Sequence, residues 1–177
     1  MEATGAGCEA VSRRRIAEAW IVWFQELAAC FREASLAAVR LADALSSYAA
    51  ADAESALKTL SDLEGRLLAH AREGEALRLA SRRAFALEDL APPSTYVKLL
   101  SARGEERRLA EILEARMRAA EEAVREFARA RARLQGVAEA GIREAELARA
   151  LLASQAFGAP PPSAVGKLPP RVFDGRA

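Results

Sequence analysis

The chain has 177 residues, with 26 basic against 25 acidic side chains and a formal net charge of +1. Near-neutrality at 29% charged residues excludes both a wholly basic nucleic-acid tail and an acidic disordered chain. Alanine supplies 43 residues and leucine 22, while glycine, proline and β-branched residues are few, so the sequence predicts a single all-α domain and not a sheet sandwich or barrel.

The N-terminal residues 1–11 lack apolar periodicity and predict a flexible arm, with order beginning at the candidate N-cap Ser12. An arginine triplet at 13–15 and an apolar run at 16–24 imitate an export signal. However, Glu18 would place a charge inside the bilayer. We therefore expect an intracellular protein, soluble or within a macromolecular assembly, with no membrane span.

A first long helix is predicted over about residues 12–50, where no glycine or proline interrupts apolar residues recurring at steps of three and four. The stripe consists of Ile16, Trp20, Trp23/Phe24, Leu27, Phe31, Ala34, Ala38, Ala42, Leu45 and Tyr48.

A second helix is predicted over about residues 52–90, with Asp52 as its N-cap. Gly65 and Gly74 lie inside its stripe and indicate either a close helix crossing or a bend near residue 74. Two prolines, 92–93, end this helix, and a short helix is expected over about residues 95–103. The stripe of the second helix consists of Leu57, Leu60, Leu67, Ala71, Leu77, Ala80 and Ala84.

The last helix is predicted over about residues 105–156, with a heptad-type apolar seam, and a proline- and glycine-rich extended tail follows at 158–177. Short connections then predict an elongated antiparallel bundle of about three long helices plus one short helix. Because alanine stripes bury little area per residue, we expect another chain to complete the burial. The seam consists of Leu109, Leu113, Met117, Ala120, Val124, Phe127, Arg131, Leu134, Ala138 and Gly141/Ile142, and continues through Ala145, Ala148 and Leu152.

Five consecutive large apolar residues at 20–24 face every direction around the first helix, so one neighbouring element cannot cover them all. In one interpretation these aromatic side chains fill the wide end of the core beneath the short helix. In the other, an oligomer or partner interface consists of Trp20, Trp23, Phe24 and Phe31.

The sequence offers no arrangement typical of catalysis. The single histidine, His70, is predicted at the surface or boundary of its helix, and it cannot supply the paired Glu-x-x-His motifs of a di-metal bundle. Cys8 and Cys30 lack metal-ligand spacing and are expected to be small apolar residues. We therefore predict no enzyme, catalytic residue, cofactor, metal or small-molecule substrate.

Arginine is used to excess, with 23 arginines against 3 lysines. One interpretation is a solvated face whose arginines pair with acids at helical spacing, such as Arg107 with Glu111. The other is a row that contacts nucleic-acid phosphates, and no aromatic residues interleave with it as single-strand stacking would require. The candidate phosphate contacts are Arg13, Arg14, Arg15, Arg125, Arg129, Arg131 and Arg133.

Three functional hypotheses follow. The preferred one is a non-enzymatic assembly subunit that docks on itself or on another protein chain through its alanine-rich and Trp/Phe-rich faces and its tail. The second is a nucleic-acid-binding helical subunit, of filament-coat type or from a ribonucleoprotein complex, that contacts the backbone without reading sequence. The third and weakest is a helical accessory factor or chaperone for one client.

Overall fold

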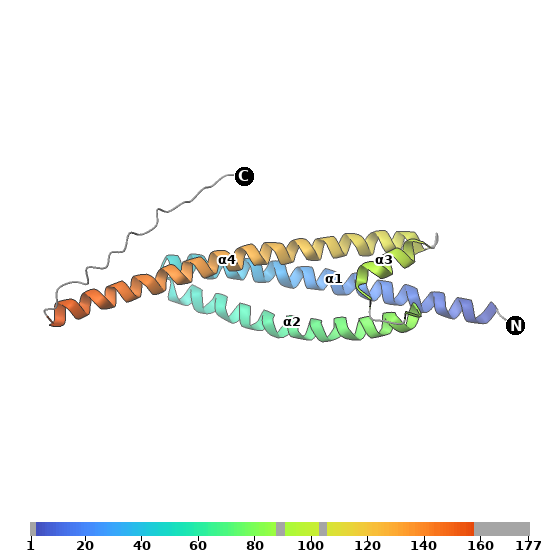
Figure 1. The fold of residues 1–177 in the computed structure, drawn as a ribbon, viewed down its shortest axis with the longest axis horizontal. Helices are drawn as coiled ribbons and strands as arrows, with labels where there is room; N and C mark the ends of the chain where they lie inside the picture. Colours follow the sequence, from blue (N-terminus) through green and yellow to red (C-terminus); the bar gives the residue numbers. More distant parts are fainter. Residues whose placement is uncertain (1–2, 88–90, 103–105, 158–177) are drawn as a thin grey trace. The chain divides into compact units, whose positions relative to one another are not determined.

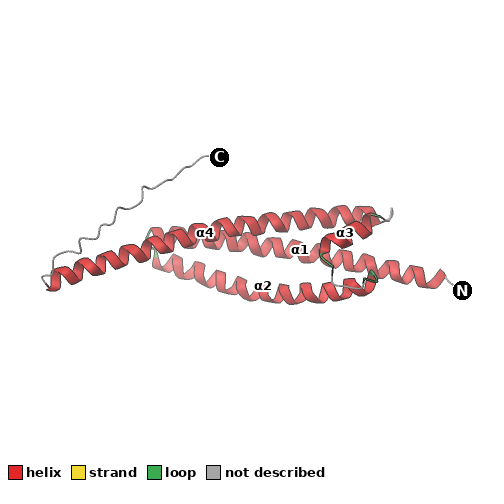
Figure 2. Ribbon diagram, in the orientation of Figure 1, coloured by secondary structure: helices red, strands yellow, loops and turns green. Residues whose placement is uncertain are grey.

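The computed structural model describes the backbone of residues 3–87, 91–102 and 106–157, and the side chains of 12–87, 91–102 and 106–152. This part of the chain forms four helices (Figures 1 and 2). They are α1 (Ala3–Ser46), α2 (Ala50–Ala84), α3 (Pro93–Ser101) and α4 (Arg107–Phe157). The all-α prediction of three long helices and one short helix is confirmed. The predicted tail at 158–177 lies outside the described residues.

The chain divides into two compact units, residues 1–137 and 138–177. In the first unit α1 packs against α2 on one side, and against α3 and the first half of α4 on the other. None of the described helices combines the length and the apolar character that crossing a bilayer requires.

α1 and α2 both end earlier than predicted, because each terminates in a residue with left-handed backbone. Tyr48 has φ 58° and Ala86 has φ 51°. The N–H of Ala49 donates to the carbonyl of Ala44 at 2.9 Å, and that of Leu87 to the carbonyl of Arg82 at 3.0 Å. These bonds are typical of a Schellman motif, whose left-handed position usually holds glycine. A search for glycine therefore misses both ends.

α1 also begins earlier than predicted, at Ala3 and not at Ser12. Extending an existing helix by one residue costs little once the nucleus has formed, so the three alanines within residues 3–11 continue it. The backbone of the predicted arm is therefore helical from residue 3.

The core of the first unit lies where α1 meets α3 and α4. Trp20 is 1% exposed, and its ring stacks on Tyr96 of α3 with centroids 6.2 Å apart. α3 thus covers part of the aromatic run, as the first interpretation of residues 20–24 expects. The buried cluster at this meeting point consists of Ala17, Trp20, Phe24, Ala28, Tyr96, Leu100, Ala110, Leu113, Ala120 and Ala123.

The buried face of α4 differs from the predicted seam in its middle. Val124 is 40% exposed and Arg131 is exposed, whereas their neighbours Ala123 and Ala130 are buried. The alanines face inward because a small side chain lets the helix axes approach closely. The predicted seam is therefore wrong by one residue at these two positions.

α2 also presents a different face from the one predicted. Leu57 and Ala71 are exposed, while Leu63 is buried together with the small or polar His70, Gly74 and Ser81. A pattern built from apolar side chains misses His70 and Ser81, whereas Gly74 lies inside the predicted stripe. Side chains of α1 contact all three. In α1 the predicted stripe is buried or half-buried as far as Ala42, but its last members, Leu45 and Tyr48, are exposed because the helix ends there.

Candidate functional site

The aromatic side chains of α1 form a connected cluster. Trp23 meets Trp20 edge to face with centroids 5.3 Å apart, and meets Phe24 in the same way at 4.9 Å. Trp20 and Phe24 stack at 5.6 Å. Phe24 follows Trp20 by four positions, which places both on one helix face, whereas Trp23 lies beside that face. The cluster therefore spreads from the core toward the neighbouring helix α2.

Trp20 is fixed in the core by a buried serine of α2. Its indole Nε1 donates to Ser81 Oγ at 2.8 Å, and Ser81 Oγ donates in turn to the carbonyl of Leu77 at 2.7 Å. Ser81 has no exposed surface. A buried indole N–H needs an acceptor, so the serine serves as polar partner within an apolar contact.

Trp23 is held against α2 by a glycine. Its Nε1 donates to the carbonyl of His70 at 2.9 Å. A Cβ on Gly74 would come within 2.8 Å of the indole Cζ2, closer than two carbons pack. Gly74 therefore marks a close approach of side chain to helix, whereas a Cβ on Gly65 would meet no atom within 4 Å.

A groove of about 720 Å³ opens beside these rings, with α1 as its floor and α2 and α4 as its walls. It lies within the first unit. Two prolines at the start of α3, Pro92 and Pro93, also line it. We call it the aromatic groove. Its lining consists of Trp20, Trp23, Phe24, Leu27, Phe31, Leu67, Ala71, Gly74, Glu75, Arg78, Pro92, Pro93, Ser94, Met117 and Glu121.

The lining of the aromatic groove combines a large apolar surface with three charged side chains. Its floor and most of its walls are apolar, and its charged side chains are Glu75, Arg78 and Glu121. Grooves of this kind accept the apolar face of an amphipathic helix.

The four residues predicted as an interface all border the aromatic groove. Trp20 presents little surface to it because it belongs to the core, and Phe24 is buried at its floor. Trp23 and Phe31 are half-buried. The opposite walls, supplied by residues such as Ala71 and Met117, were missed as site residues, because only the fold brings α2 and α4 to the two sides of α1.

A second cluster surrounds His70 on another side of α2. His70 is 7% exposed, so the prediction of a surface or boundary histidine is wrong; the ring packs edge to face with Trp23 at 5.9 Å. Its Nε2 lies 3.6 Å from Glu26 Oε2, and its Nδ1 lies 3.3 Å from Glu73 Oε2. Burial follows from the position of His70 on the covered face of α2.

These three side chains could be considered as metal ligands, since their ligand atoms lie within 4.8 Å of one another. However, the two carboxylates lie beside different ring nitrogens of His70. A metal ion binds one nitrogen of an imidazole, so an ion at either nitrogen would have only one of the two carboxylates beside it. The three side chains line a small cavity, and Arg66 lines it too. Its hydrogen bond to Glu33, at 2.7 Å, raises the pKa of the guanidinium, and a nearby permanent cation opposes a metal ion.

Cys30 lines the same cavity as a buried free thiol, as expected of a small apolar residue. The side chain of Cys8 lies outside the described residues.

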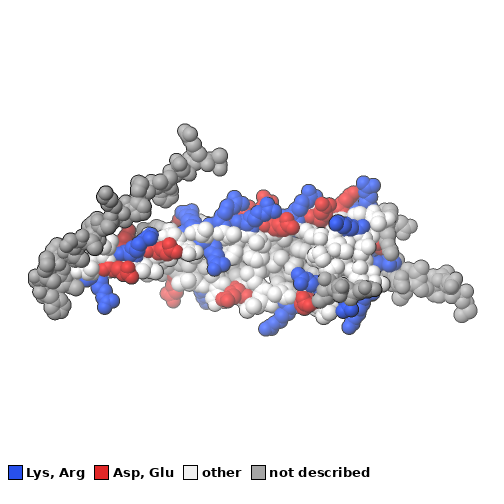
Figure 3. All heavy atoms as spheres, viewed as in Figure 1, with Lys and Arg blue, Asp and Glu red and all other residues white. Residues whose placement is uncertain are grey.

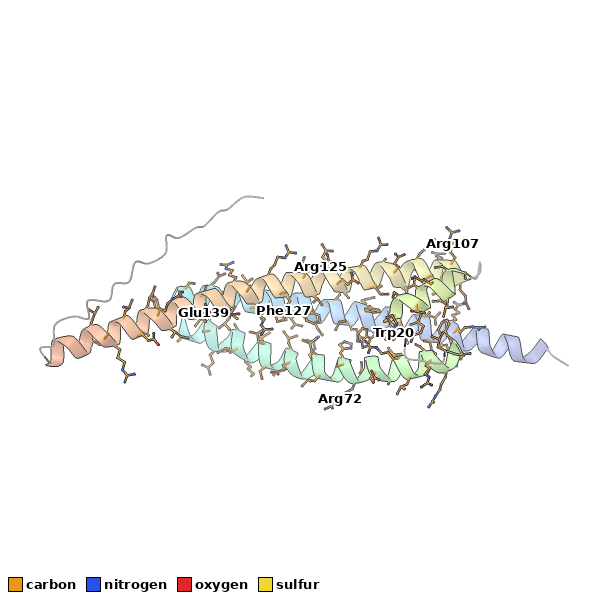
Figure 4. All side chains as sticks on the ribbon, in the orientation of Figure 1. Trp20, Arg72, Arg107, Arg125, Phe127 and Glu139 are labelled. Atoms are coloured by element: carbon orange, nitrogen blue, oxygen red, sulfur yellow. The ribbon has the colours of Figure 1, made fainter. Side chains whose placement is uncertain are left out.

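The predicted phosphate contacts on α4 are interspersed with acids. Arg125 points outward (Figure 4) and pairs with Glu121, one turn away, at 3.4 Å. Arg107, which is not among the predicted contacts, points outward and pairs in the same way with Glu111 at 3.3 Å. Arg133 Nη2 donates to Asp43 Oδ1 of α1 at 2.6 Å. Figure 3 shows acidic and basic side chains mixed along the visible side of α4. The predicted pair of Arg107 with Glu111 is confirmed.

The remaining predicted phosphate contacts are distributed over two helices. Arg14 of α1 pairs with Glu18 at 2.9 Å, and Arg15 is exposed beside it, while Arg13 is half-buried. On α4, Arg129 and Arg131 are exposed.

Comparison with known protein families, curated proteins and solved structures gives no match for this chain.

Proposed function

We propose that the protein is a non-enzymatic assembly subunit that docks an apolar helix of another protein chain in the aromatic groove. The observation that carries this proposal is the open cavity of about 720 Å³ above the α1 rings. Trp23 and Phe31 face it only half-buried, although both are large apolar side chains. Aromatic residues in such positions dominate many protein interfaces.

The hydrophobic effect supports the same proposal. Burying apolar surface stabilises a complex by about 25 cal/mol per Å², and a concave floor of rings offers more such surface than a flat patch. An added helix between α2 and α4 would complete a four-helix arrangement around the floor of α1. The alanine-rich helix contacts elsewhere in the first unit add little to the total buried apolar surface, because each alanine side chain buries little area.

Affinity capture from cells that express the protein tests this function. Ala71 is exposed and lines one wall of the groove, so Ala71→Glu adds a charge there without altering the core. Ala115→Glu makes the same change at an exposed site of α4 away from the groove. We expect wild type and Ala115→Glu to capture the same partners and Ala71→Glu to lose them. An identical set from all three proteins would contradict the proposal.

Backbone binding to nucleic acid is a second proposal, favoured by the exposed Arg129 and Arg131 beside Arg125. We rank it lower because Arg125 and Arg133 already pair with acids, so phosphates would compete with those contacts.

Fluorescence anisotropy with duplex and single-stranded oligonucleotides across a salt series checks the nucleic-acid proposal. Binding should weaken steeply with salt, and Arg129→Glu with Arg131→Glu should abolish it. The proposal is wrong if the wild type binds no oligonucleotide at low salt, or if the double variant binds equally well.

A further inference from the structure

The second unit carries a helix face that the fold leaves exposed. Within residues 138–152 of α4, Ile142 is 60% and Leu152 is 67% exposed. The continuation of the predicted heptad seam falls on one side of this segment, about 120° wide at 100° per residue. We call it the α4 stripe. It consists of Ala138, Gly141, Ile142, Ala145, Ala148 and Leu152.

We propose that the α4 stripe of a second copy of this chain is the helix that the aromatic groove accepts. This inference rests on the proposed function, which requires a helix in the groove, and adds the identity of that helix. The occupant comes from a second molecule, so the contact is made in trans.

The dimensions of the two surfaces agree. The groove floor runs from Trp20 to Phe31, eleven residues of α1 or about 17 Å at 1.5 Å per residue. The apolar part of the stripe runs from Ile142 to Leu152, ten residues or about 15 Å. Each therefore spans about three helical turns.

The side-chain sizes are complementary as well. The floor presents the half-buried rings of Trp23 and Phe31. The middle of the stripe consists of small residues, Ala145 and Ala148, which allow a helix to approach these rings. The large stripe residues, Ile142 and Leu152, can reach walls that contain the small Ala71. Large side chains facing small ones is how packed helical layers interdigitate.

The area of one such contact is small for a stable complex, since standard interfaces bury about 1,600 Å² in total. Two chains that each insert a stripe into the other's groove make the contact twice. This exchange closes as a symmetric dimer, whereas a one-way contact would extend into a chain of molecules.

Light scattering coupled to size-exclusion chromatography on the full chain tests the inference. The wild type should elute at about twice its 19.0 kDa mass. Leu152→Glu, in the stripe, and Ala71→Glu, in the groove, should each raise the dimer dissociation constant at least about tenfold, because each places a charge in an apolar contact. Both positions are exposed, so circular dichroism should show unchanged helix content.

Leu147→Glu is the matched control. Leu147 is 65% exposed, like Leu152, but lies five residues away, about 140° around the helix axis. It should leave the dimer intact, as should Ala115→Glu. Equal loss of the dimer in Leu147→Glu and Leu152→Glu would overturn the inference.

Mixing the two interface variants distinguishes groove-to-stripe pairing from stripe-to-stripe pairing. Leu152→Glu keeps an intact groove, and Ala71→Glu keeps an intact stripe. Neither variant should associate with itself, but a mixture of the two should form a dimer, in which the Ala71→Glu stripe occupies the Leu152→Glu groove. A mixture that stays monomeric, or a dimer unaffected by Ala71→Glu, would contradict the inference. A monomeric wild type would also contradict it, while partner capture that depends on Ala71 would leave the proposed function standing.

Discussion

At the scale of single residues, Gly74 and Trp23 fit each other. We expect Gly74→Ala to lower the free energy of unfolding, because its Cβ would lie 2.8 Å from a rigid indole. Overpacking costs about 1–3 kcal/mol, which exceeds the helix-propensity gain of up to about 1 kcal/mol. Gly65→Ala, with nothing within 4 Å, should instead raise stability by about 0.5–1 kcal/mol. Urea denaturation measures both, and a stabilised Gly74→Ala would refute the close approach.

The buried Ser81 gives a second residue-scale prediction. Ser81→Ala leaves the indole N–H of Trp20 without its acceptor, at a cost of about 1–3 kcal/mol in unfolding free energy. Ser35→Ala is the control, since Ser35 Oγ also donates one turn back, to the carbonyl of Phe31, but its change strands no buried donor. Thermal and urea unfolding should separate the two variants, and equal losses would argue against this role of the hydrogen bond.

Sequence patterns predict the aromatic residues of the candidate site better than their partners. Trp23 and Phe31 are recognisable because large rings are rare in this chain. His70 and Ser81 are not, because polar residues on a covered helix face carry no apolar signal. Each is covered by an indole from α1: Trp23 packs on His70, and Trp20 donates to Ser81. These contacts join residues far apart in the sequence, so a helical repeat does not predict them.

At the scale of the elements, the helix ends depend on left-handed residues. Ala86 has φ 51°, a conformation that glycine adopts without the strain of a Cβ. Ala86→Gly should therefore raise the free energy of unfolding by about 0.5–1 kcal/mol, although glycine is normally destabilising. Ala115→Gly, inside α4, should lower it by about 1 kcal/mol. If denaturation shows both variants destabilised alike, the left-handed end of α2 is wrong.

Helix number and type follow from sequence because apolar residues recur at steps of three and four over long uninterrupted segments. The sequence predicts less well which residues of each helix face the core. A heptad pattern favours Val124 over Ala123 on hydrophobicity, yet close approach of two helices favours the smaller residue. In an alanine-rich chain these two preferences conflict, so the seam shifts by one residue where α4 packs on α1.

At the scale of the whole molecule, the aromatic groove and the exposed α4 stripe share one physical origin. Among the described residues, the alanine-rich helices pack closely, while large apolar side chains such as Trp23 and Phe31 in the groove and Ile142 and Leu152 on the stripe keep exposed surface. In the proposed dimer a second chain covers these side chains, so association would extend the burial of apolar surface that folding begins.

The most direct measurement of this central claim is photo-crosslinking in cells, with a benzophenone amino acid at position 71 in the wall of the groove. We predict a covalent adduct to another chain, with the crosslinked peptide mapping to residues 138–152 of a second copy. The same probe at the exposed position 115 of α4 should give none. Position 71 giving no more adduct than position 115 would contradict the claim that the aromatic groove binds a helix.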